Sequence, residues 1–265
     1  MFKDINKVIT LARKAGAAII DIYHKDFAVY DKSDSSPLTE ADLAAHHILV
    51  NGLTRLKPSY PVLSEESDEE VKAERMNWDS YWLVDPLDGT KEFIKKNGEF
   101  TVNVALIVKG EPVLGVVYAP AVETMYWGEK ERGAFKQISN EEAVSIQVAK
   151  VPKVAEGWRV VGSRSHQSEE FVDFMKVLPN ADIVAMGSSL KLCLVAEGRA
   201  DLYPRLGPTS EWDTAAAHGV VLAAGGQVLE LETLTPLTYN SRPDTLLNPF
   251  FVVCSGVSPL WCRNS

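Results

Sequence analysis

The chain has 265 residues, of which 46% are hydrophobic and 24% are charged, so it can bury a sizeable core and is not an intrinsically disordered protein. Its 36 acidic residues outnumber its 27 basic ones, and the net charge of −9 argues against a general surface for nucleic acid polymers or anionic membranes. A small phosphorylated ligand is compatible with this charge where local cations or metal ions offset it.

The three cysteines, Cys193, Cys254 and Cys262, show no CxxC spacing, so the sequence predicts neither a disulfide framework nor a zinc site. Reduced thiols of this kind fit the cytoplasm. The N-terminal segment is charged and amphipathic, unlike a signal peptide, and no apolar run approaches membrane-spanning length. We therefore expect a cytoplasmic protein without a transmembrane segment. The sequence leaves open peripheral association with the inner membrane and the choice between monomer and homodimer.

In chain order, the first half predicts two helices followed by β-strands. Apolar residues at helical spacing between Ile5 and Ile20 indicate an amphipathic helix. The polar segment "DKSDSSPLTEAD" predicts a loop, within which a second helix begins at Thr39. The following β-rich segments predict strands at "YPVLSEES", "YWLVDPLDGT", "TVNVALIVKGEPVLGVVYAP" and "ETMYWGEKERGAFK", the last two as hairpins.

The second half alternates strands and helices. Strands are predicted at "WRVVGSRSH", "ADIVAMGSS", "ADLYPR" and "FFVVCSG", and helices at "SEEFVDFMKVL", "LKLCLVAEG" and "EWDTAAAHGVVLAAGG". The fold class is therefore α+β with a mostly antiparallel sheet in the first half and α/β in the second. We expect one domain, 1–265, in two lobes, 1–150 and 151–265.

Acidic residues gather where these elements begin or end. Glu65 and Glu66 follow one strand, Asp85 and Asp88 end the next, and the remaining two, Asp42 and Asp213, lie in the first turns of helices. Carboxylate oxygens suit hard cations such as Mg²⁺ and Mn²⁺. Two such ions roughly 4 Å apart can activate a water and stabilise the leaving oxygen of a phosphate ester.

Each acidic residue also has a structural explanation when it is taken alone. Thr39 to Asp42 matches a capping box, and Asp213 can be a first-turn carboxylate stabilised by the helix dipole. Glu66 can be a solvated loop residue, and Asp-Pro and Asp-Gly are common turn dipeptides. Because every acid stands at the end of an element, the set as a whole favours a metal site.

The segment after Asp85 can serve both a metal and a phosphate. The i, i+3 spacing lets a turn present Asp85 and Asp88, with the Leu87 carbonyl between them as a further ligand. Gly89 and Thr90 then offer backbone N–H groups at the start of a helix, which favour phosphate, and the Thr90 hydroxyl can orient an attacking water.

Four segments together carry a resemblance to a known family. "SSPLTEAD", "PVLSEES", "WLVDPLDGT" and "EWDTAAAHGVVLAAGG" resemble the signature segments of the inositol-monophosphatase superfamily of Mg²⁺-dependent, lithium-sensitive phosphatases. Within it, "WLVDPLDGTKEFIKKNGEFTVNVALI" and "GSSLKLCLVAEGRADLYPR" are most similar to bacterial 3'(2'),5'-bisphosphate nucleotidases. Those hydrolases convert adenosine 3',5'-bisphosphate, a by-product of sulfate assimilation, to AMP and phosphate.

The resemblance implies a layered α-β-α-β-α sandwich and two or three Mg²⁺ ions, for which Mn²⁺ can substitute. Glu65, Asp85 and the Leu87 carbonyl would hold the first ion, and Asp85, Asp88 and Asp213 the second. Asp42, Thr90 and Glu65 would be the catalytic residues, with Thr90 and Asp42 positioning the water. The residues beside the substrate would include Glu65, Leu87, Asp88, Gly89, Thr90 and Asp213.

A second anion site is predicted in the second half from Ser188, Lys191 and Arg205. Ser188 stands at a strand-to-helix junction, Lys191 lies on the same helix face, and Arg205 ends a strand. The structural alternatives are a helix N-cap for Ser188 and solvated surface for the two cations. Bisphosphate nucleotidases resemble this pattern and use it on the 5'-phosphate. His166 is a further candidate for nucleotide contact, with a surface-loop histidine as the alternative.

Other functions remain open at this point. Inositol monophosphatase and fructose bisphosphatase are the alternative activities, and the phosphosulfate analogue is a further possible substrate. A non-catalytic metal or nucleotide binder is the alternative of a different class, because fold alone does not decide function. The other histidines are expected to be structural, in helices away from the acids (His24, His46, His47 and His218).

Overall fold

The computed structural model describes residues 2, 4–25, 27–31, 37–153, 156–162 and 168–262. The first part contains α1 (Ile5–Tyr23), β1 (Val29–Asp31), β2 (Pro37–Thr39), α2 (Glu40–Leu53), β3 (Val62–Ser64), α3 (Glu69–Glu74), η1 (Arg75–Asn77), β4 (Ser80–Asp88), α4 (Thr90–Ile94), β5 (Thr101–Val108), β6 (Glu111–Ala119), η2 (Pro120–Val122), β7 (Thr124–Glu129), β8 (Gly133–Ile138) and β9 (Val144–Ile146). The second contains β10 (Arg159–Gly162), α5 (Glu169–Met175), β11 (Asp182–Ala185), α6 (Leu190–Ala196), β12 (Leu202–Arg205), α7 (Glu211–Ala223), β13 (Gln227–Glu230) and β14 (Phe251–Cys254).

Two large sheets organise the molecule. The seven-stranded sheet runs β3-β4-β5-β6-β7-β8-β9, with β3 and β4 parallel and every other neighbouring pair antiparallel. The five-stranded sheet runs β11-β10-β12-β14-β13, parallel among its first three strands and antiparallel at β14. The strands thus change from antiparallel hairpins to a mixed sheet after residue 146.

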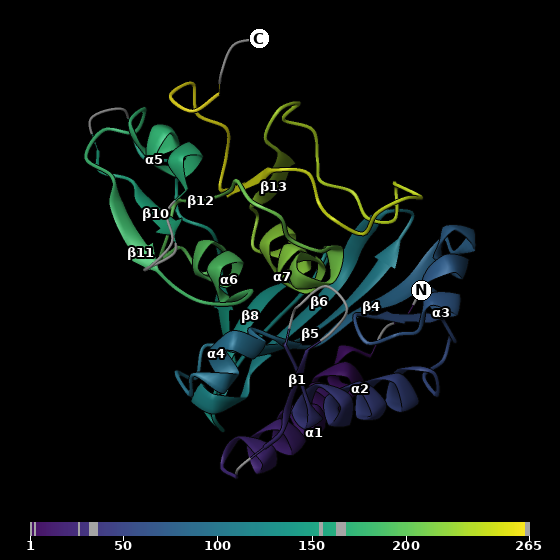
Figure 1. The fold of residues 1–265 in the computed structure, drawn as a ribbon. Coiled ribbons are helices and arrows are strands. Elements are labelled where there is room, and N and C mark those ends of the chain that lie inside the picture. The colour runs from purple at the N-terminus through teal and green to yellow at the C-terminus, as the bar shows by residue number, and fades with distance from the viewer. Residues whose placement is uncertain are drawn as a thin grey trace.

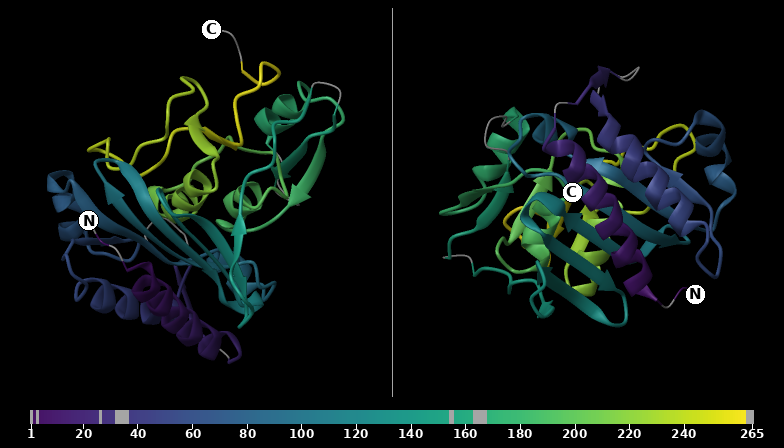
Figure 2. Two further views of the ribbon diagram at one scale, coloured as in Figure 1. Left: turned by 180° about the vertical axis from the view of Figure 1, so that it is seen from behind. Right: turned by 90° about the horizontal axis from the view of Figure 1, so that it is seen from below.

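The helices and sheets form alternating layers (Figure 1). Helices α1 and α2 cover one face of the seven-stranded sheet, and α6 and α7 lie between the two sheets. The outer face of the five-stranded sheet packs against α5 through Phe171. Figure 2 shows from below how α1 and α2 run side by side across the sheet. The predicted α-β-α-β-α sandwich is therefore confirmed.

Strand alternation assigns the apolar residues to separate core layers. In β4, Tyr81 and Leu83 pack in the layer that contains α6 and α7, while Trp82 and Val84 pack in the layer that contains α1 and α2. Successive side chains of a strand point to opposite faces, and both faces of this strand are covered. That is why the sequence of β4 is continuously apolar rather than alternating.

Close packing fixes α7 on the seven-stranded sheet. A Cβ atom at Gly115 of β6 would lie 1.9 Å from the carbonyl oxygen of Ala216 in α7. A Cβ at Gly128 of β7 would lie 2.7 Å from the Cβ of Ala223. Glycine is needed at both positions because the helix backbone approaches the strands too closely for a side chain. These contacts hold α7 close against the sheet, and Asp213 lies in its first turn.

The structure corrects two details of the sequence analysis. The predicted loop "DKSDSSPLTEAD" is wrong at Pro37–Thr39, which pairs with β1 as strand β2. No strand is predicted at Val144–Ile146, which forms the short strand β9 at the edge of the larger sheet. Both strands have three residues, too few for a periodic pattern. Among the residues described, no helix combines the length and apolar character needed to cross a bilayer.

Candidate active site

The acidic residues meet at the carboxyl end of β4. Asp85 and Asp88 come from β4 itself, and Asp213 comes from the first turn of α7. One carboxylate oxygen from each of these three residues lies within 4.8 Å of the other two. Three separate carboxylates this close together can bind one or more hard cations.

A β-bulge, rather than the predicted turn, brings Asp85 and Asp88 to the same face. Asp85 pairs with Asn103 of β5, but Asp88 pairs with Thr101, so β4 has one extra residue between the two pairs. In a regular strand, residues i and i+3 point to opposite faces. The extra residue reverses the alternation, and Leu87 accordingly packs in the layer of α1 and α2. Asp88 therefore points, like Asp85, towards α7.

Burial and mutual repulsion perturb these carboxylates. Burial raises the pKa of Asp85 well above its usual value, and the negative charges of Glu65, Asp88, Asp213 and Asp42 raise it further. Burial and Asp213 raise the pKa of Asp88 to about 7, although Lys191 and the N–H of Ser189 act in the opposite direction. Burial also raises the pKa of Asp213. Buried like charges of this kind are stabilised by a bound cation, so the residues fit a divalent metal site.

Glu65 lies beside this cluster without belonging to its closest group. It follows β3, and its backbone N–H donates to the carbonyl oxygen of Val84 at 3.0 Å. Because β3 and β4 are parallel, their carboxyl ends meet at the same edge of the sheet. The Glu65 carboxylate is close enough to raise the pKa of Asp85, but it lies outside the set of oxygens within 4.8 Å.

Asp42 has both a structural contact and a contact at the site. Its Oδ2 accepts bonds from the N–H and the hydroxyl of Thr39, at 2.8 and 2.6 Å, and closes the predicted capping box of α2. Its Oδ1 accepts a bond from the hydroxyl of Thr90 at 3.3 Å. The same hydroxyl lies 3.3 Å from the carbonyl oxygen of Leu87. The capping interpretation and the catalytic one are therefore compatible.

Asp213 is arranged in the same way. Its Oδ2 accepts bonds from the Ser210 N–H at 2.9 Å and the Thr209 hydroxyl at 2.8 Å, which closes the capping box of α7. One oxygen thus holds the carboxylate at the start of the helix, while the carboxylate still lies within the acidic cluster. A ligand held by its own helix cap loses little further freedom when a cation binds.

Gly89 makes the sharp change from β4 to α4 possible. Its φ of 90° lies in the left-handed region, and a Cβ atom there would lie 3.0 Å from the carbonyl oxygen of Glu99. Glycine is the residue that adopts this conformation without strain. Helix α4 then begins at Thr90, as predicted, next to Asp88.

The three residues of the predicted second anion site line one cavity. Ser188, Lys191 and Arg205 surround a pocket of about 90 Å³ together with Asp88 and Asp213. Lys191 and Arg205 are partly buried there rather than solvated, and the Nε atom of Arg205 has no hydrogen-bond partner among the described residues. The N-cap of α6 is Ser189, whereas Ser188 adopts a left-handed φ of 45°. Ser188 is therefore not the N-cap residue, although its hydroxyl accepts a weak hydrogen bond from the N–H of Leu190, the first residue of α6, at 3.5 Å. His166 lies outside the described residues.

Sequence reasoning did not identify the side chains that surround Asp88. Its Oδ2 accepts a bond from the Ser189 N–H at 2.5 Å and lies 3.5 Å from the Thr101 hydroxyl. The Ser189 hydroxyl lies 2.8 Å from Thr101 Oγ1 and 2.8 Å from Asn103 Oδ1. Thr101 and Asn103 are the β5 partners of Asp88 and Asp85, so the strand register could have pointed to them.

The histidines divide into two kinds. His218 is buried in α7 with its Nδ1 2.9 Å from the hydroxyl of Tyr239, and burial lowers its pKa to about 3. This is the expected structural role. Burial lowers the pKa of His46, and Glu66 is close enough to oppose this shift, so the expectation that His46 lies away from the acids is wrong. Its Nδ1 contacts the Ser64 hydroxyl at 2.9 Å.

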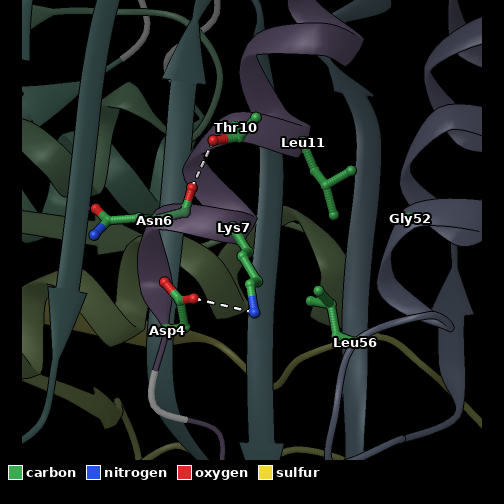
Figure 3. A pocket seen from close by; sticks show the side chains of 7 residues that line it. All are labelled: Asp4, Asn6, Lys7, Thr10, Leu11, Gly52 and Leu56. Carbon is green, nitrogen blue, oxygen red and sulfur yellow. Dashed lines mark hydrogen bonds and ion pairs between the residues drawn. The ribbon is translucent and has the colours of Figure 1, made fainter.

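A larger pocket of about 360 Å³ lies elsewhere, between α1 and the end of α2. Figure 3 shows its lining, in which Lys7 pairs with Asp4 at 3.2 Å and Thr10 donates to the Asn6 carbonyl oxygen at 2.8 Å. Its one carboxylate is already paired, and α1 and α2 cover the face of the sheet opposite α7. The residues that line this pocket therefore do not form a group of carboxylates that could bind a metal ion.

Comparison with known proteins agrees with this geometry. The model of the inositol monophosphatase family matches residues 3–249. The chain is 47% identical to the 3'(2'),5'-bisphosphate nucleotidase CysQ of Salmonella typhimurium over 251 residues, which cover 94% of this chain and 98% of that protein. The corresponding CysQ of Escherichia coli strain K12 gives the same identity and coverage.

Solved structures show the same fold. The crystal structure of CysQ from Bacteroides thetaiotaomicron has a TM-score of 0.82 and 40% sequence identity, and the match covers 96% of this chain and 98% of that one. The inositol monophosphatase of Thermotoga maritima has a TM-score of 0.75 and 26% identity, covering 96% of this chain and 93% of that one.

Proposed function

Because the chain belongs to the inositol monophosphatase family, we propose that it removes the 3'-phosphate of adenosine 3',5'-bisphosphate, releasing AMP and phosphate. The observation that carries this proposal is the cavity in which Ser188, Lys191 and Arg205 lie against Asp88 and Asp213. A substrate with two phosphates would place one at the acidic cluster and the other beside the cations. The phosphosulfate analogue of adenosine 3',5'-bisphosphate is a further substrate of the same shape.

We assign the metal ligands by the same reasoning. Glu65, Asp85 and the Leu87 carbonyl would hold one Mg²⁺, and Asp85, Asp88 and Asp213 would hold another. Two or three ions act in turnover, and Mn²⁺ substitutes for Mg²⁺ because both accept oxygen ligands. When bound, such ions lower the pKa of a water molecule and stabilise negative charge on phosphate oxygens.

Thr90 and Asp42 orient the attacking water. The Thr90 hydroxyl can donate to Oδ1 of Asp42 or to the Leu87 carbonyl, and a cation held by that carbonyl would leave the hydrogen to Asp42. The Thr90 oxygen then accepts a hydrogen bond from the water, and a proton can pass from the water through Thr90 to Asp42. The N–H groups of Gly89 and Thr90 at the start of α4 hold the phosphate that reacts.

The cationic pocket holds the phosphate that does not react. Lys191 and the guanidinium of Arg205 supply positive charge, and the Nε of Arg205, which has no partner among the residues described, supplies a donor. An inositol monophosphate has one phosphate, so it would leave this cationic pocket empty. The pocket therefore favours a bisphosphate substrate over an inositol monophosphate. A non-catalytic binder would have no use for the contact between Thr90 and Asp42.

The deciding experiment compares phosphate release from adenosine 3',5'-bisphosphate, inositol 1-phosphate and fructose 1,6-bisphosphate, each with Mg²⁺ and with chelator. We expect the highest kcat/KM for the adenosine compound and no turnover in chelator. A higher kcat/KM for either sugar phosphate would support the alternative activity. Binding of the nucleotide without phosphate release would support the non-catalytic binder.

We further propose that the chain acts in the cytoplasm as one domain in two lobes, 1–150 and 151–265, and as a monomer or a homodimer. The continuous apolar layer that joins both sheets through α6 and α7 supports one cooperative unit. A single unfolding transition seen alike by calorimetry and circular dichroism is expected. Two separate transitions would contradict the one-domain assignment.

A further inference from the structure

Ser189 stands at the N-cap of α6 but does not cap it. A serine at this position usually accepts a hydrogen bond from an N–H in the first turn of its own helix. Here the side chain makes no such bond. Its hydroxyl instead reaches β5, where it lies 2.8 Å from Thr101 Oγ1 and 2.8 Å from Asn103 Oδ1. Helix capping therefore does not explain this side chain.

The hydrogen atoms of this network can be assigned. A carbonyl oxygen only accepts, so Ser189 donates its single hydroxyl hydrogen to Asn103, and Thr101 donates its own to Ser189. The Thr101 hydrogen is then already used, and its 3.5 Å contact with Asp88 is a weak one. All three residues are buried, with at most 2% of their surface exposed. Water therefore does not compete for these bonds.

The position of Ser189 matters for Asp88, because the two residues share a hydrogen bond. The short hydrogen bond that this carboxylate accepts at Oδ2 comes from the backbone N–H of Ser189, at 2.5 Å. Ser189 lies 101 positions further along the chain. Because the chain between them is long, the position of this N–H depends on tertiary contacts, namely the burial of α6 between the sheets and the contacts of Ser189 with β5.

We propose that Ser189 is a positioning residue for metal binding by Asp88, an inference that rests on the metal-ligand role assigned above. Its hydroxyl, held by Thr101 and Asn103, keeps its backbone N–H on Oδ2 of Asp88. That bond restrains the carboxylate, one oxygen of which lies within 4.8 Å of oxygens of Asp85 and Asp213. Outer contacts of this kind orient ligands before the metal arrives and so raise affinity.

The test uses the full-length protein and Mn²⁺ as the probe, with binding measured by electron paramagnetic resonance in the absence of substrate. Ser189→Ala removes the hydroxyl and keeps the N–H. Thr101→Val removes the partner hydroxyl at nearly constant volume, and Thr101→Ser restores it. Ser258→Ala is the matched control, because Ser258 is also buried but lies beyond β14, in the C-terminal segment.

We expect Ser189→Ala and Thr101→Val to weaken Mn²⁺ binding by about tenfold to a hundredfold, and Thr101→Ser and Ser258→Ala to leave it unchanged. The Mg²⁺ concentration for half-maximal activity should rise in parallel, with kcat restored at saturating Mg²⁺. A purely structural role would lower the melting temperature equally with and without Mn²⁺ and would leave the affinity unchanged. That result would overturn the proposal.

The proposed function and this inference can fail separately. A wild-type protein that releases no phosphate from adenosine 3',5'-bisphosphate would contradict the function, whatever the variants do. An active wild type whose Ser189→Ala and Thr101→Val variants bind Mn²⁺ normally would contradict the inference alone. If Ser189→Ala does not fold, the comparison of Thr101→Val with Thr101→Ser decides.

Discussion

The hydroxyl of Thr90 lies 3.3 Å from Oδ1 of Asp42, and Oδ2 of the same carboxylate holds Thr39 at the start of α2. One carboxylate therefore fixes the beginning of a helix and also directs a hydroxyl beside the acidic cluster. Since Oδ2 is held by two short bonds, Oδ1 has a defined position before any substrate arrives.

Removing this hydroxyl should slow the chemical step. We expect Thr90→Val to lower kcat by about a hundredfold to ten-thousandfold, because the water loses the group that orients it and accepts its proton. Steady-state kinetics with adenosine 3',5'-bisphosphate measures the effect. Thr90→Ser keeps the hydroxyl and should retain most of the activity.

Mn²⁺ affinity provides the control for this prediction. Thr90 is not among the proposed ligands, so its valine variant should bind the ion as the wild type does. A Thr90→Val protein with wild-type kcat would show that the contact with Asp42 serves only to hold α2 and α4 together.

Lys191 and Arg205 should determine the preference for bisphosphates. A charge-assisted hydrogen bond to the second phosphate contributes about 1.5–3 kcal/mol, which corresponds to roughly tenfold to a hundredfold in kcat/KM. Lys191→Ala and Arg205→Ala should therefore lower kcat/KM for adenosine 3',5'-bisphosphate and leave adenosine 3'-monophosphate nearly unchanged. An equal loss for both substrates would show that the residue does not contact the 5'-phosphate.

Asp88→Asn should weaken metal binding without unfolding the protein. Asparagine keeps the shape and one acceptor oxygen of the side chain but removes the negative charge that attracts the cation. We expect a higher Mg²⁺ requirement and a large loss of activity at modest Mg²⁺, measured by titration of the ion in the phosphate-release assay. Full turnover by this variant, or by the wild type in chelator, would contradict the metal assignment.

His218 should make the stability depend on acidity. Burial lowers its pKa from 6.5 to about 3, so below pH 6.5 the unfolded chain binds a proton that the folded protein does not. The contribution of His218 to the free energy of unfolding is therefore complete above pH 6.5 and falls as the pH decreases towards about 3. Urea unfolding at a series of pH values measures it.

The matched variant for this prediction is His218→Asn, which removes the titrating ring and keeps a polar group near Tyr239. Its unfolding free energy should change less between neutral and mildly acidic pH than that of the wild type. The same slope in both proteins would show that other groups cause the acid sensitivity.

Local patterns predicted the elements that position the site. The apolar run of β4 and the capping pattern at Thr39 and Asp42 are each contained within a few residues, and each formed the expected structure. The acidic cluster could also be predicted, because each carboxylate stands where an element begins or ends.

The other features of the site depend on contacts between residues that are far apart in the sequence. The bulge between Asp85 and Asp88 exists because β4 gains a residue relative to β5, and neither strand shows this by itself. The bond between Ser189 and Asp88 joins residues 101 positions apart, and the local sequence suggested an N-cap role only for the neighbouring Ser188. Tertiary packing places the Ser189 side chain against β5, and no periodic pattern in the sequence indicates this contact.

The most direct test of the account is to identify the product formed from adenosine 3',5'-bisphosphate in the presence of Mg²⁺. Phosphate release and nucleotide chromatography should show equal amounts of inorganic phosphate and AMP, with neither formed by Asp88→Asn at modest Mg²⁺. This result would place the 3'-phosphate at the acidic cluster and the 5'-phosphate in the cationic pocket. Adenosine 3'-monophosphate as the product, or no phosphate release at all, would contradict the proposed function.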